Sequence, residues 1–250
     1  MAIEAGVSWT IGILLLSLRI GPVFVLAPPF SQTQVPMRVR VCLVLALAAC
    51  LARGVPSAAY ANGAALVIAA ATELMLGLAI AFAFQTAFAA LSFAGRVLDV
   101  QAGYGLAMVI DPGSRAQAPL FGTILTLVAG LLFFATNGHL ELLRLFTTLQ
   151  RVIPVGYAGL TGSPQALIGY FGMTMGMGLS AVSAVMVTLF LIDLSIAFLS
   201  RALPQMNALM LGLQVKTIAT LVMMTLSAGL LVPTALRLMT HALTLVPSLE

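Results

Sequence analysis

Charged residues are scarce in this chain. Asp, Glu, Lys and Arg make up 7% of its 250 residues, against about a quarter in an ordinary soluble domain. Apolar residues make up 61%, and the mean hydropathy is +1.13. The formal net charge of +4 comes from basic residues scattered along the chain, with no basic block of the kind that binds nucleic acid. We therefore expect a membrane-associated protein with no nucleic-acid partner.

The sequence also lacks the side chains that catalysis or metal binding would need. Cys42 and Cys50 lie about 12 Å apart along a helix, too far to bridge, and we expect both to be small core residues. His139 and His241 stand alone, without the spacing of a zinc site. Gly103-Tyr104-Gly105 lacks the third glycine of a dinucleotide loop. We expect no enzyme, no metal and no cofactor.

Long apolar runs dominate what is present, and they predict an all-α fold. Several runs are too long or too short for the ~30 Å hydrocarbon layer, which favours helical hairpins packed against partner subunits. Glu141, Arg144 and Arg151 alternate with leucines, so that segment is predicted to be amphipathic. Pro233 predicts a kink in the last run. The expected helices cover about 7–27, 36–52, 64–93, 120–136, 140–153, 166–200 and 208–246.

The stretch 94–119 interrupts these runs with glycine, proline and charge. Its turn signals argue against a continuous helix through its second half. Its centre is nevertheless apolar, and such residues seek a partner surface rather than water. Two interpretations stay open: a loop packed for stability, and a movable constriction in a pore. The residues of the candidate constriction are Gly103, Tyr104, Gly105, Leu106, Ala107, Met108, Val109, Ile110, Asp111 and Pro112.

Four charges lie inside the apolar runs, where an unpaired charge is costly: Arg19, Glu73, Asp193 and Lys216. Asp193 and Lys216 flank the polar turn 201–207 at comparable depth, so we expect them to pair across an antiparallel hairpin. Arg19 has two open interpretations, a contact to another helix or subunit and a snorkel at a helix end. A proton relay is the functional alternative for Glu73, Asp193 and Lys216.

The last third of the chain is predicted to be a helical hairpin. A Gly/Pro/Ser-rich break at 154–164 marks the candidate boundary before it. Small residues at four-residue spacing form a ridge that lets another helix approach closely: Gly172, Gly176, Ser180 and Ala184. The turn of the hairpin contains Arg201, Pro204, Gln205, Met206 and Asn207.

In this order, the motifs resemble the FliR family, the flagellar biosynthesis proteins of the type III export gate, and their virulence-secretion counterparts. The resemblance covers nearly the whole chain, and its most specific stretch is the hairpin turn. The residues that carry it are Arg19, Pro22, Ala27-Pro28-Pro29-Phe30, Pro36, Arg38, Arg40, Glu73, Gly77, Gly95, Asp99, Gln101, Gly103, Asp111-Pro112, Asn137-Gly138-His139, Pro154, Gly156, Asp193, Arg201, Pro204-Gln205-Met206-Asn207, Gly212 and Lys216.

The resemblance implies a single-copy subunit of a helical assembly with FliP and FliQ, contacted by FlhB and FlhA. Unfolded flagellar proteins would leave the cytoplasm through this assembly, in the bacterial inner membrane within the flagellar basal body. A FliP-like part (1–160) would be fused to a FliQ-like hairpin (161–250), and the loop within 94–119 would be a plug in the closed pore. Its glycines suit movement and its apolar side chains suit a seal.

Two alternatives have a different function. The first is the equivalent subunit of a virulence type III secretion system. The second is a small-solute secondary transporter, which would need a pair of corresponding helix breaks in two halves of the chain, and the sequence shows no such pair. A lipid-modifying or intramembrane enzyme would need an acid, base or nucleophile constellation that is missing.

Overall fold

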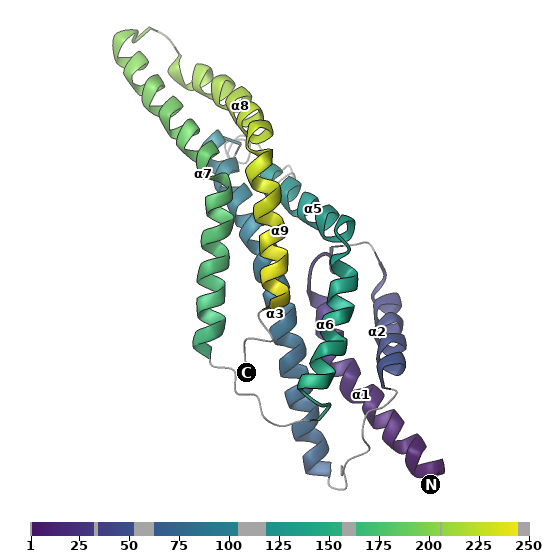
Figure 1. Cartoon of the computed structure of the whole chain (residues 1–250). Helices are drawn as coiled ribbons and strands as arrows, with labels where there is room; N and C mark the ends of the chain where they lie inside the picture. Colours follow the sequence, from purple (N-terminus) through teal and green to yellow (C-terminus); the bar gives the residue numbers. More distant parts are fainter. Residues whose placement is uncertain are drawn as a thin grey trace. The chain divides into compact units, whose positions relative to one another are not determined.

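A computed structural model describes residues 2–32, 35–52, 63–104, 119–156, 164–205 and 207–244. Figure 1 labels the helices and colours them by their position in the sequence. Their bounds lie within two or three residues of most of the ranges expected from the sequence, with larger differences in the first, third and last. They are α1 (Ala2–Leu26), α2 (Met37–Leu51), α3 (Gly63–Ala102), α5 (Leu120–Ala135), α6 (Gly138–Val152), α7 (Pro164–Ala202), α8 (Ala208–Leu226) and α9 (Ala228–Thr244).

The chain forms two compact units, and the first contains Met1–Thr86, Phe133–Phe171 and Met239–Glu250. In this unit α1 packs against α2 through Leu16, Ala48 and Ala52. The amphipathic character predicted for the segment around Arg144 is confirmed in α6. One face of this helix is buried and consists of residues three or four apart, while its charges lie on the other face. The buried face is Leu142, Leu145, Phe146 and Leu149.

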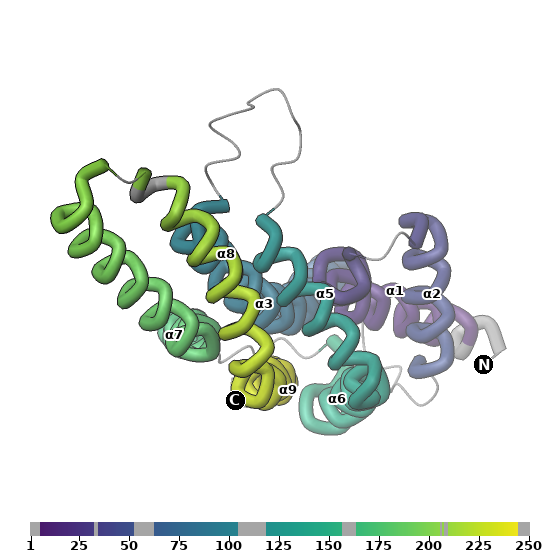
Figure 2. Tube along the Cα trace, turned by 90° about the horizontal axis from the view of Figure 1, so that it is seen from above, coloured from purple at the N-terminus to yellow at the C-terminus, as the bar shows by residue number. Residues whose placement is uncertain are grey.

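The second unit contains Ala87–Leu132 and Gly172–Leu238. Within it α7 and α8 run side by side as the predicted hairpin (Figures 1 and 2). Helix α7 approaches α3 closely at Gly178, where a Cβ atom would lie 2.8 Å from the carbonyl oxygen of Ala90. Each unit contains helices from before and after the expected boundary near 154–164.

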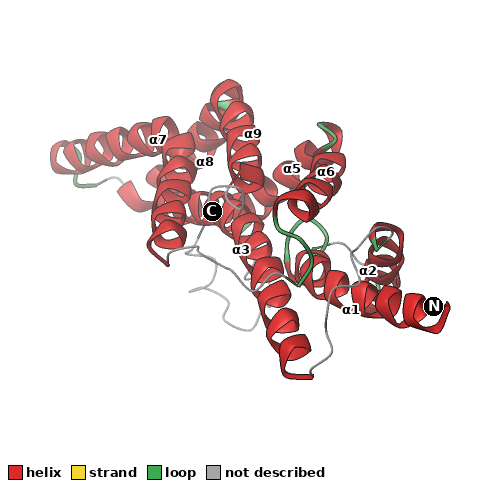
Figure 3. Cartoon of the chain, turned by 60° about the horizontal axis from the view of Figure 1, so that its bottom comes forward, coloured by secondary structure: helices red, strands yellow, loops and turns green. Residues whose placement is uncertain are grey.

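Every regular element in the described ranges is a helix (Figure 3), which confirms the predicted all-α class. Among the described residues, three stretches are long and apolar enough to cross a membrane: Gly6–Leu26 in α1, α3 and α7. The α5–α6 pair and the α8–α9 pair are each bent at a short break, and they raise the number to five if each pair is one span. This is the composition of a membrane-associated all-α fold.

Helix α3 is longer than the sequence predicts, because it continues to Ala102 instead of ending near residue 93. Gly95 lies inside the helix, where an added Cβ would be 2.4 Å from the backbone nitrogen of Gly122. This glycine therefore permits a close helix contact and does not break the helix. At a rise of ~1.5 Å per residue α3 is about 60 Å long, roughly twice the hydrocarbon thickness.

Gly103 ends α3, with a positive φ of 91° that favours glycine. Its N–H donates to Val100 O at 3.2 Å, and the N–H of Tyr104 donates to Asp99 O at 2.9 Å. These two bonds form a Schellman motif, which satisfies carbonyl groups at the end of a helix. The sequence predicts a turn at Gly103, and the helix end confirms it. Gly105 to Pro112 lie outside the described residues.

The bend in the last apolar run is not at Pro233, as the sequence predicts, but at Ser227, where α8 and α9 meet at 63°. The N–H of Ser227 donates to Met223 O and closes α8, while its carbonyl accepts from Leu230 and Leu231 and begins α9. Serine is common at helix ends because its hydroxyl can hydrogen-bond to neighbouring backbone groups. Pro233 is then accommodated inside α9.

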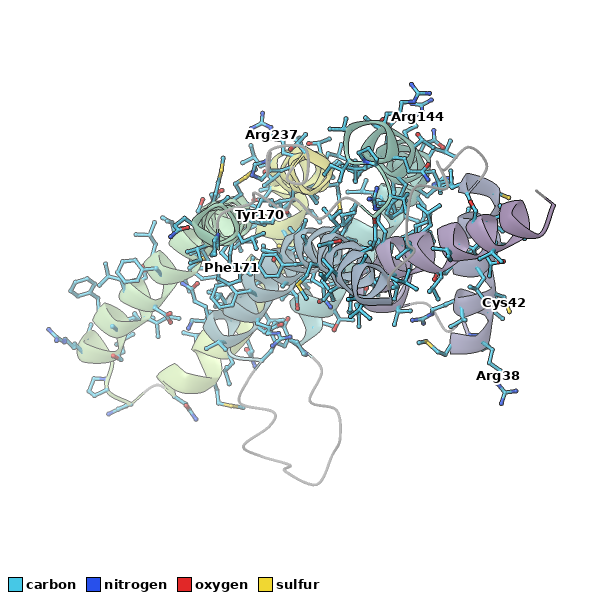
Figure 4. The ribbon with its side chains drawn as sticks, turned by 90° about the horizontal axis from the view of Figure 1, so that it is seen from below. Arg38, Cys42, Arg144, Tyr170, Phe171 and Arg237 are labelled. Carbon is cyan, nitrogen blue, oxygen red and sulfur yellow. The ribbon has the colours of Figure 1, made fainter. Side chains whose placement is uncertain are left out.

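The two cysteines are exposed on α2, so the prediction that they are core residues is wrong. Figure 4 shows Cys42 and Arg38 on the outer side of this helix. The buried positions of α2 are Val44 and Ala48. Cys42 is two residues from Val44, about 200° around the helix, and therefore lies on the opposite face.

Gly178 and Gly172 on α7 give opposite predictions for the same substitution. Gly178→Ala should destabilise the fold by roughly 1–3 kcal/mol, because its Cβ would collide with the α3 backbone. Gly172→Ala should stabilise it by up to ~1 kcal/mol, because a Cβ there meets nothing within 4 Å and alanine favours the helix. Thermal unfolding followed by circular dichroism in detergent measures both. Equal melting temperatures would contradict the α3–α7 contact.

Candidate functional site

A buried ion pair joins α1 to α3. Arg19 Nε donates to Glu73 Oε2 at 2.5 Å, and Arg19 Nη2 donates to Glu73 Oε1 at 2.9 Å. Each side chain is only 1% exposed. The pair is bidentate, which is the strongest arrangement of guanidinium and carboxylate. Of the two interpretations left open for Arg19, the structure shows the internal contact and not the snorkel.

A glycine explains why this pair can form. Gly77 lies one turn after Glu73 on α3, and a Cβ atom there would be 2.5 Å from the carbonyl oxygen of Arg19. The two helix backbones therefore touch beside the charges. Any larger residue at position 77 would push α1 away and separate Arg19 from Glu73.

The same two side chains hold the segment that follows α6. Arg19 Nη1 and Nη2 both donate to Ile153 O at 3.1 Å. The N–H of Gly156 donates to Glu73 Oε1 at 2.7 Å, and Gly156 has a positive φ of 82°. The oppositely charged Arg19–Glu73 pair thus holds together three parts of the first unit: α1, α3 and the segment after α6. It also explains why Arg19, Glu73 and Gly156 occur together among the motif residues. We call this set, Arg19, Glu73, Ile153 and Gly156, the Arg19 network.

In the second unit Lys216 of α8 forms an ion pair with Asp193 of α7, as the spacing around the hairpin turn predicts. Lys216 Nζ also donates to Gln101 O at 3.2 Å, and Gln101 Nε2 donates to Met186 O at 2.8 Å. Lys216 is 16% exposed and Asp193 is 46% exposed. The lysine therefore joins α3, α7 and α8, while the outer side of the Asp193 carboxylate is open.

The hairpin turn is exposed in this chain at Arg201, Pro204 and Gln205. Asn207 caps α8, because its side-chain oxygen accepts from Met210 N at 3.2 Å. Met206 lies outside the described residues. The polar turn thus ends one helix and begins the next.

The small-residue ridge on α7 is exposed among the described residues. All four of its members are exposed, and a Cβ atom at Gly172 or Gly176 would meet nothing within 4 Å. The contact of α7 inside its unit uses Gly178, which the sequence pattern did not single out. The members of the ridge are Gly172, Gly176, Ser180 and Ala184.

Asp99 is a buried charge whose role sequence reasoning missed. Its carboxylate is 6% exposed and accepts from Phe121 N at 3.0 Å and Gly122 N at 3.3 Å, in the first turn of α5. The signal that could have found it was a lone Asp inside an apolar run, the criterion that singled out Glu73 and Asp193. Tyr104 lies beside Phe121, with ring centroids 5.7 Å apart.

The described residues contain no group of three His, Cys, Asp or Glu side chains that would hold a metal ion. The two histidines pack against aromatic rings: His139 against Phe134 at a centroid distance of 5.7 Å, and His241 against Tyr170 at 5.1 Å. Tyr170 in turn donates to Ala83 O at 2.9 Å. Both histidines therefore have packing partners in the first unit.

Two helix pairs in the described ranges are bent, α5–α6 by 67° and α8–α9 by 63°. The expectation that no pair of corresponding breaks lies in two halves of the chain stays a prediction. The breaks contain the uncharged residues Thr136, Asn137 and Ser227. A cavity of about 250 Å³ beside the α8–α9 break is lined almost wholly by apolar side chains, among them Leu91, Val128 and Met224.

Comparison with known proteins decides the family. The model of a family described as "Bacterial export proteins, family 1" matches residues 10–242. The chain belongs to this family. The match spans both units and includes the Arg19 network, Asp99 and the Lys216–Asp193 pair.

Among curated family relatives, the chain is 28% identical over 202 residues to the flagellar biosynthetic protein FliR of Escherichia coli K12, covering 78% of this chain and 76% of the relative. It is 27% identical over 216 residues to FliR of Bacillus subtilis, covering 84% and 83%. It is also 27% identical over 173 residues to the Yop proteins translocation protein T of Yersinia pestis, covering 68% and 64%. Chain and relatives therefore share an export family.

Breaking the Arg19–Glu73 pair on one side should be costly. Glu73→Gln would leave a buried guanidinium without its counter-charge, at about 3–5 kcal/mol, and Arg19→Met together with Glu73→Leu should recover part of this loss. The exposed pair Glu141–Arg144 is the matched control, where Glu141→Gln should cost less than ~1 kcal/mol. Thermal unfolding in detergent measures all of them. Similar losses at both pairs would contradict a central role for the Arg19 network.

Breaking the Lys216–Asp193 pair should cost less stability than breaking the Arg19–Glu73 pair, because Asp193 is half-exposed. Lys216→Met should lower the yield of folded chain, at a cost below the ~3–5 kcal/mol of a fully buried pair. Adding Asp193→Leu should restore part of the yield, since it removes the carboxylate left without a partner. The bond from Lys216 to Gln101 O stays lost, so full recovery is not expected. No recovery at all would show that the two charges act separately.

Proposed function

We propose that this chain is a subunit of the flagellar type III protein export gate, where its helices form part of the channel wall. The observation that carries the proposal is the family match over 10–242, together with flagellar relatives that align over three quarters or more of both chains. The substrates are unfolded flagellar proteins. The chain acts by forming and closing a passage and needs no catalytic group, metal or cofactor for this.

The surface of the chain supports an assembly with other membrane helices. Large apolar side chains are exposed along both helices of the C-terminal hairpin, for example Phe190, Phe198 and Ile218. The ridge from Gly172 to Ala184 adds a strip where another helix can approach closely. We propose that FliP and FliQ subunits cover these surfaces, in a FliP-like part over 1–160 and a FliQ-like hairpin over 161–250. FlhB and FlhA are further proposed partners.

The gate lies in the bacterial inner membrane, within the flagellar basal body. The long apolar helices support a membrane-embedded position, because α3 and α7 are apolar enough to cross a bilayer. The virulence type III system is the second candidate setting, supported by the similarity to the Yersinia pestis protein. That similarity covers less of the chain than the similarity to either flagellar relative above, which favours the flagellar setting.

We further propose that residues 103–112 are the plug of this passage. Two described features at its start support this: Gly103 adopts a backbone conformation that favours glycine, and Tyr104 supplies an aromatic side chain next to Phe121. The following sequence, Leu106 to Ile110, is apolar and uncharged. An apolar constriction blocks ions because water and ions do not enter it readily.

Deletion of Leu106 to Ile110 tests the proposal. The deletion should remove the apolar barrier while α3 and α5 remain, so the gate should still assemble but conduct ions. The measurement is ion conductance of the purified gate in a planar bilayer, with export followed in cells. Normal assembly with wild-type conductance and export would mean that this segment is only packing.

Gly103→Val is the complementary variant. Valine disfavours the positive φ at this position, and its side chain would meet Leu213, which lies 2.7 Å from a Cβ built on Gly103. Export should therefore slow without an ion leak. Gly63→Ala at the start of α3, where a Cβ meets nothing within 4 Å, is the control and should export normally.

A further inference from the structure

We propose that the apolar cavity beside the α8–α9 break binds one acyl chain of a membrane phospholipid, which enters lengthwise from the surrounding bilayer. The cavity has a volume of about 250 Å³, and all of its lining residues belong to the second unit. This inference goes beyond the proposed function and does not rest on it, because it needs only a membrane-embedded chain. The shape, the lining and the opening of the cavity each support this occupant.

One face of α5 and one face of α9 form the long walls of the cavity. The lining residues of each helix are three or four apart, which places them on a single side of that helix. Leu91 of α3 lies between these walls, and Met224 of α8 extends the lining across the 63° bend at Ser227. The wall residues include Ile124, Val128 and Leu132 on α5 and Ala228, Leu231 and Ala235 on α9.

The cavity is long and narrow. Its lining on α5 extends from Ile124 to Leu132, a distance of about 12 Å at ~1.5 Å per residue. Spread over this length, 250 Å³ corresponds to a mean cross-section of about 20 Å². This is the width of a single extended hydrocarbon chain, whereas a helix with its side chains is about 10–12 Å in diameter. A partner helix therefore cannot enter, and one of its side chains would fill only a part of the length.

The side chains of the lining offer water no free polar group. Thr225 is the polar residue among them, and its hydroxyl already donates to Val222 O at 2.7 Å. Water enters a cavity only where about two to four polar partners hold it, and apolar cavities of ~150 Å³ stay dry and bind small apolar molecules. An empty cavity would also leave its walls without van der Waals partners. The lining thus favours a hydrocarbon occupant.

The cavity opens to the outside of the chain through an apolar mouth. Leu91 and Leu125 are buried at its floor, while Ile124 and Val128 are exposed at its edge. The neighbouring exposed residue of α5, Leu127, is also apolar. Helix α3 is long and apolar enough to cross a bilayer, and the α8–α9 pair qualifies as one bent span. A lipid chain can therefore pass from the hydrocarbon layer to the floor without leaving apolar surroundings.

A photoreactive phospholipid tests this site. The probe is phosphatidylethanolamine with a diazirine midway along one acyl chain, in vesicles of phosphatidylethanolamine and phosphatidylglycerol. The protein is added as isolated from its own membranes, with any bound partners, and mass spectrometry locates the probe after illumination. We expect label on Leu91 and Leu125, because these buried residues line the cavity that the chain enters. Label on Leu131, which is exposed and outside the lining, reports ordinary surface lipid.

Two variants should block the site in different ways. Ala235→Phe places a ring in the cavity from its buried wall, and Val128→Trp covers the mouth from an exposed position that tolerates a larger side chain. Each should lower the label on Leu91 and Leu125 by roughly tenfold, because the acyl chain loses its space. The label on Leu131 should stay unchanged in both.

Leu127→Trp is the matched control, since it adds the same ring at the adjacent exposed position outside the lining. It should leave the label on Leu91 and Leu125 unchanged. The inference is overturned if wild type carries label on Leu131 but none on the two floor residues, as a mouth covered by a partner subunit would produce. It is also overturned if both blocking variants keep the full floor label, or if Leu127→Trp lowers that label as much as Val128→Trp does.

Discussion

The buried pairing of Arg19 with Glu73 is the interaction on which the first unit depends. A charge among apolar helices costs several kcal/mol unless a counter-charge and hydrogen bonds satisfy it. Here one bidentate pair is satisfied from two further directions, by Ile153 O and Gly156 N. Because the two side chains come from α1 and α3, the pair cannot form unless those helices meet in one register. The chain therefore encodes helix packing by placing single charges in apolar runs.

In the second unit, too, single charges inside apolar runs fix how the helices pack. The Asp99 carboxylate accepts hydrogen bonds from the first turn of α5. Lys216 forms an ion pair with Asp193 and donates a hydrogen bond to the last turn of α3. Polar groups inside the chain are thus used for packing, whereas the exposed surface is largely apolar and carries the small-residue ridge of α7. This division suits a gate subunit: internal polar contacts fix the wall, and apolar faces remain for lipid and neighbouring subunits.

Sequence patterns predict local features of this chain well and distant contacts poorly. The amphipathic α6 and the Asp193–Lys216 pair were predictable, because helix period and a short turn fix them locally. The partner of Arg19 was not, since it lies 54 residues away and the approach of α1 to α3 depends on Gly77. Glycine was misleading at Gly95, where it permits packing inside a helix. Proline was misleading at Pro233, because Ser227 already ends the preceding helix.

The central claim, that the chain is one subunit of a membrane-embedded protein export gate, is tested most directly by isolating it from its own cells. An affinity tag at native expression level, mild detergent and native mass spectrometry give the composition of the complex. The account predicts a stable complex in which one copy of this chain is bound to several copies of two other helical membrane proteins. A monodisperse monomer, or an assembly of this chain alone, would contradict it.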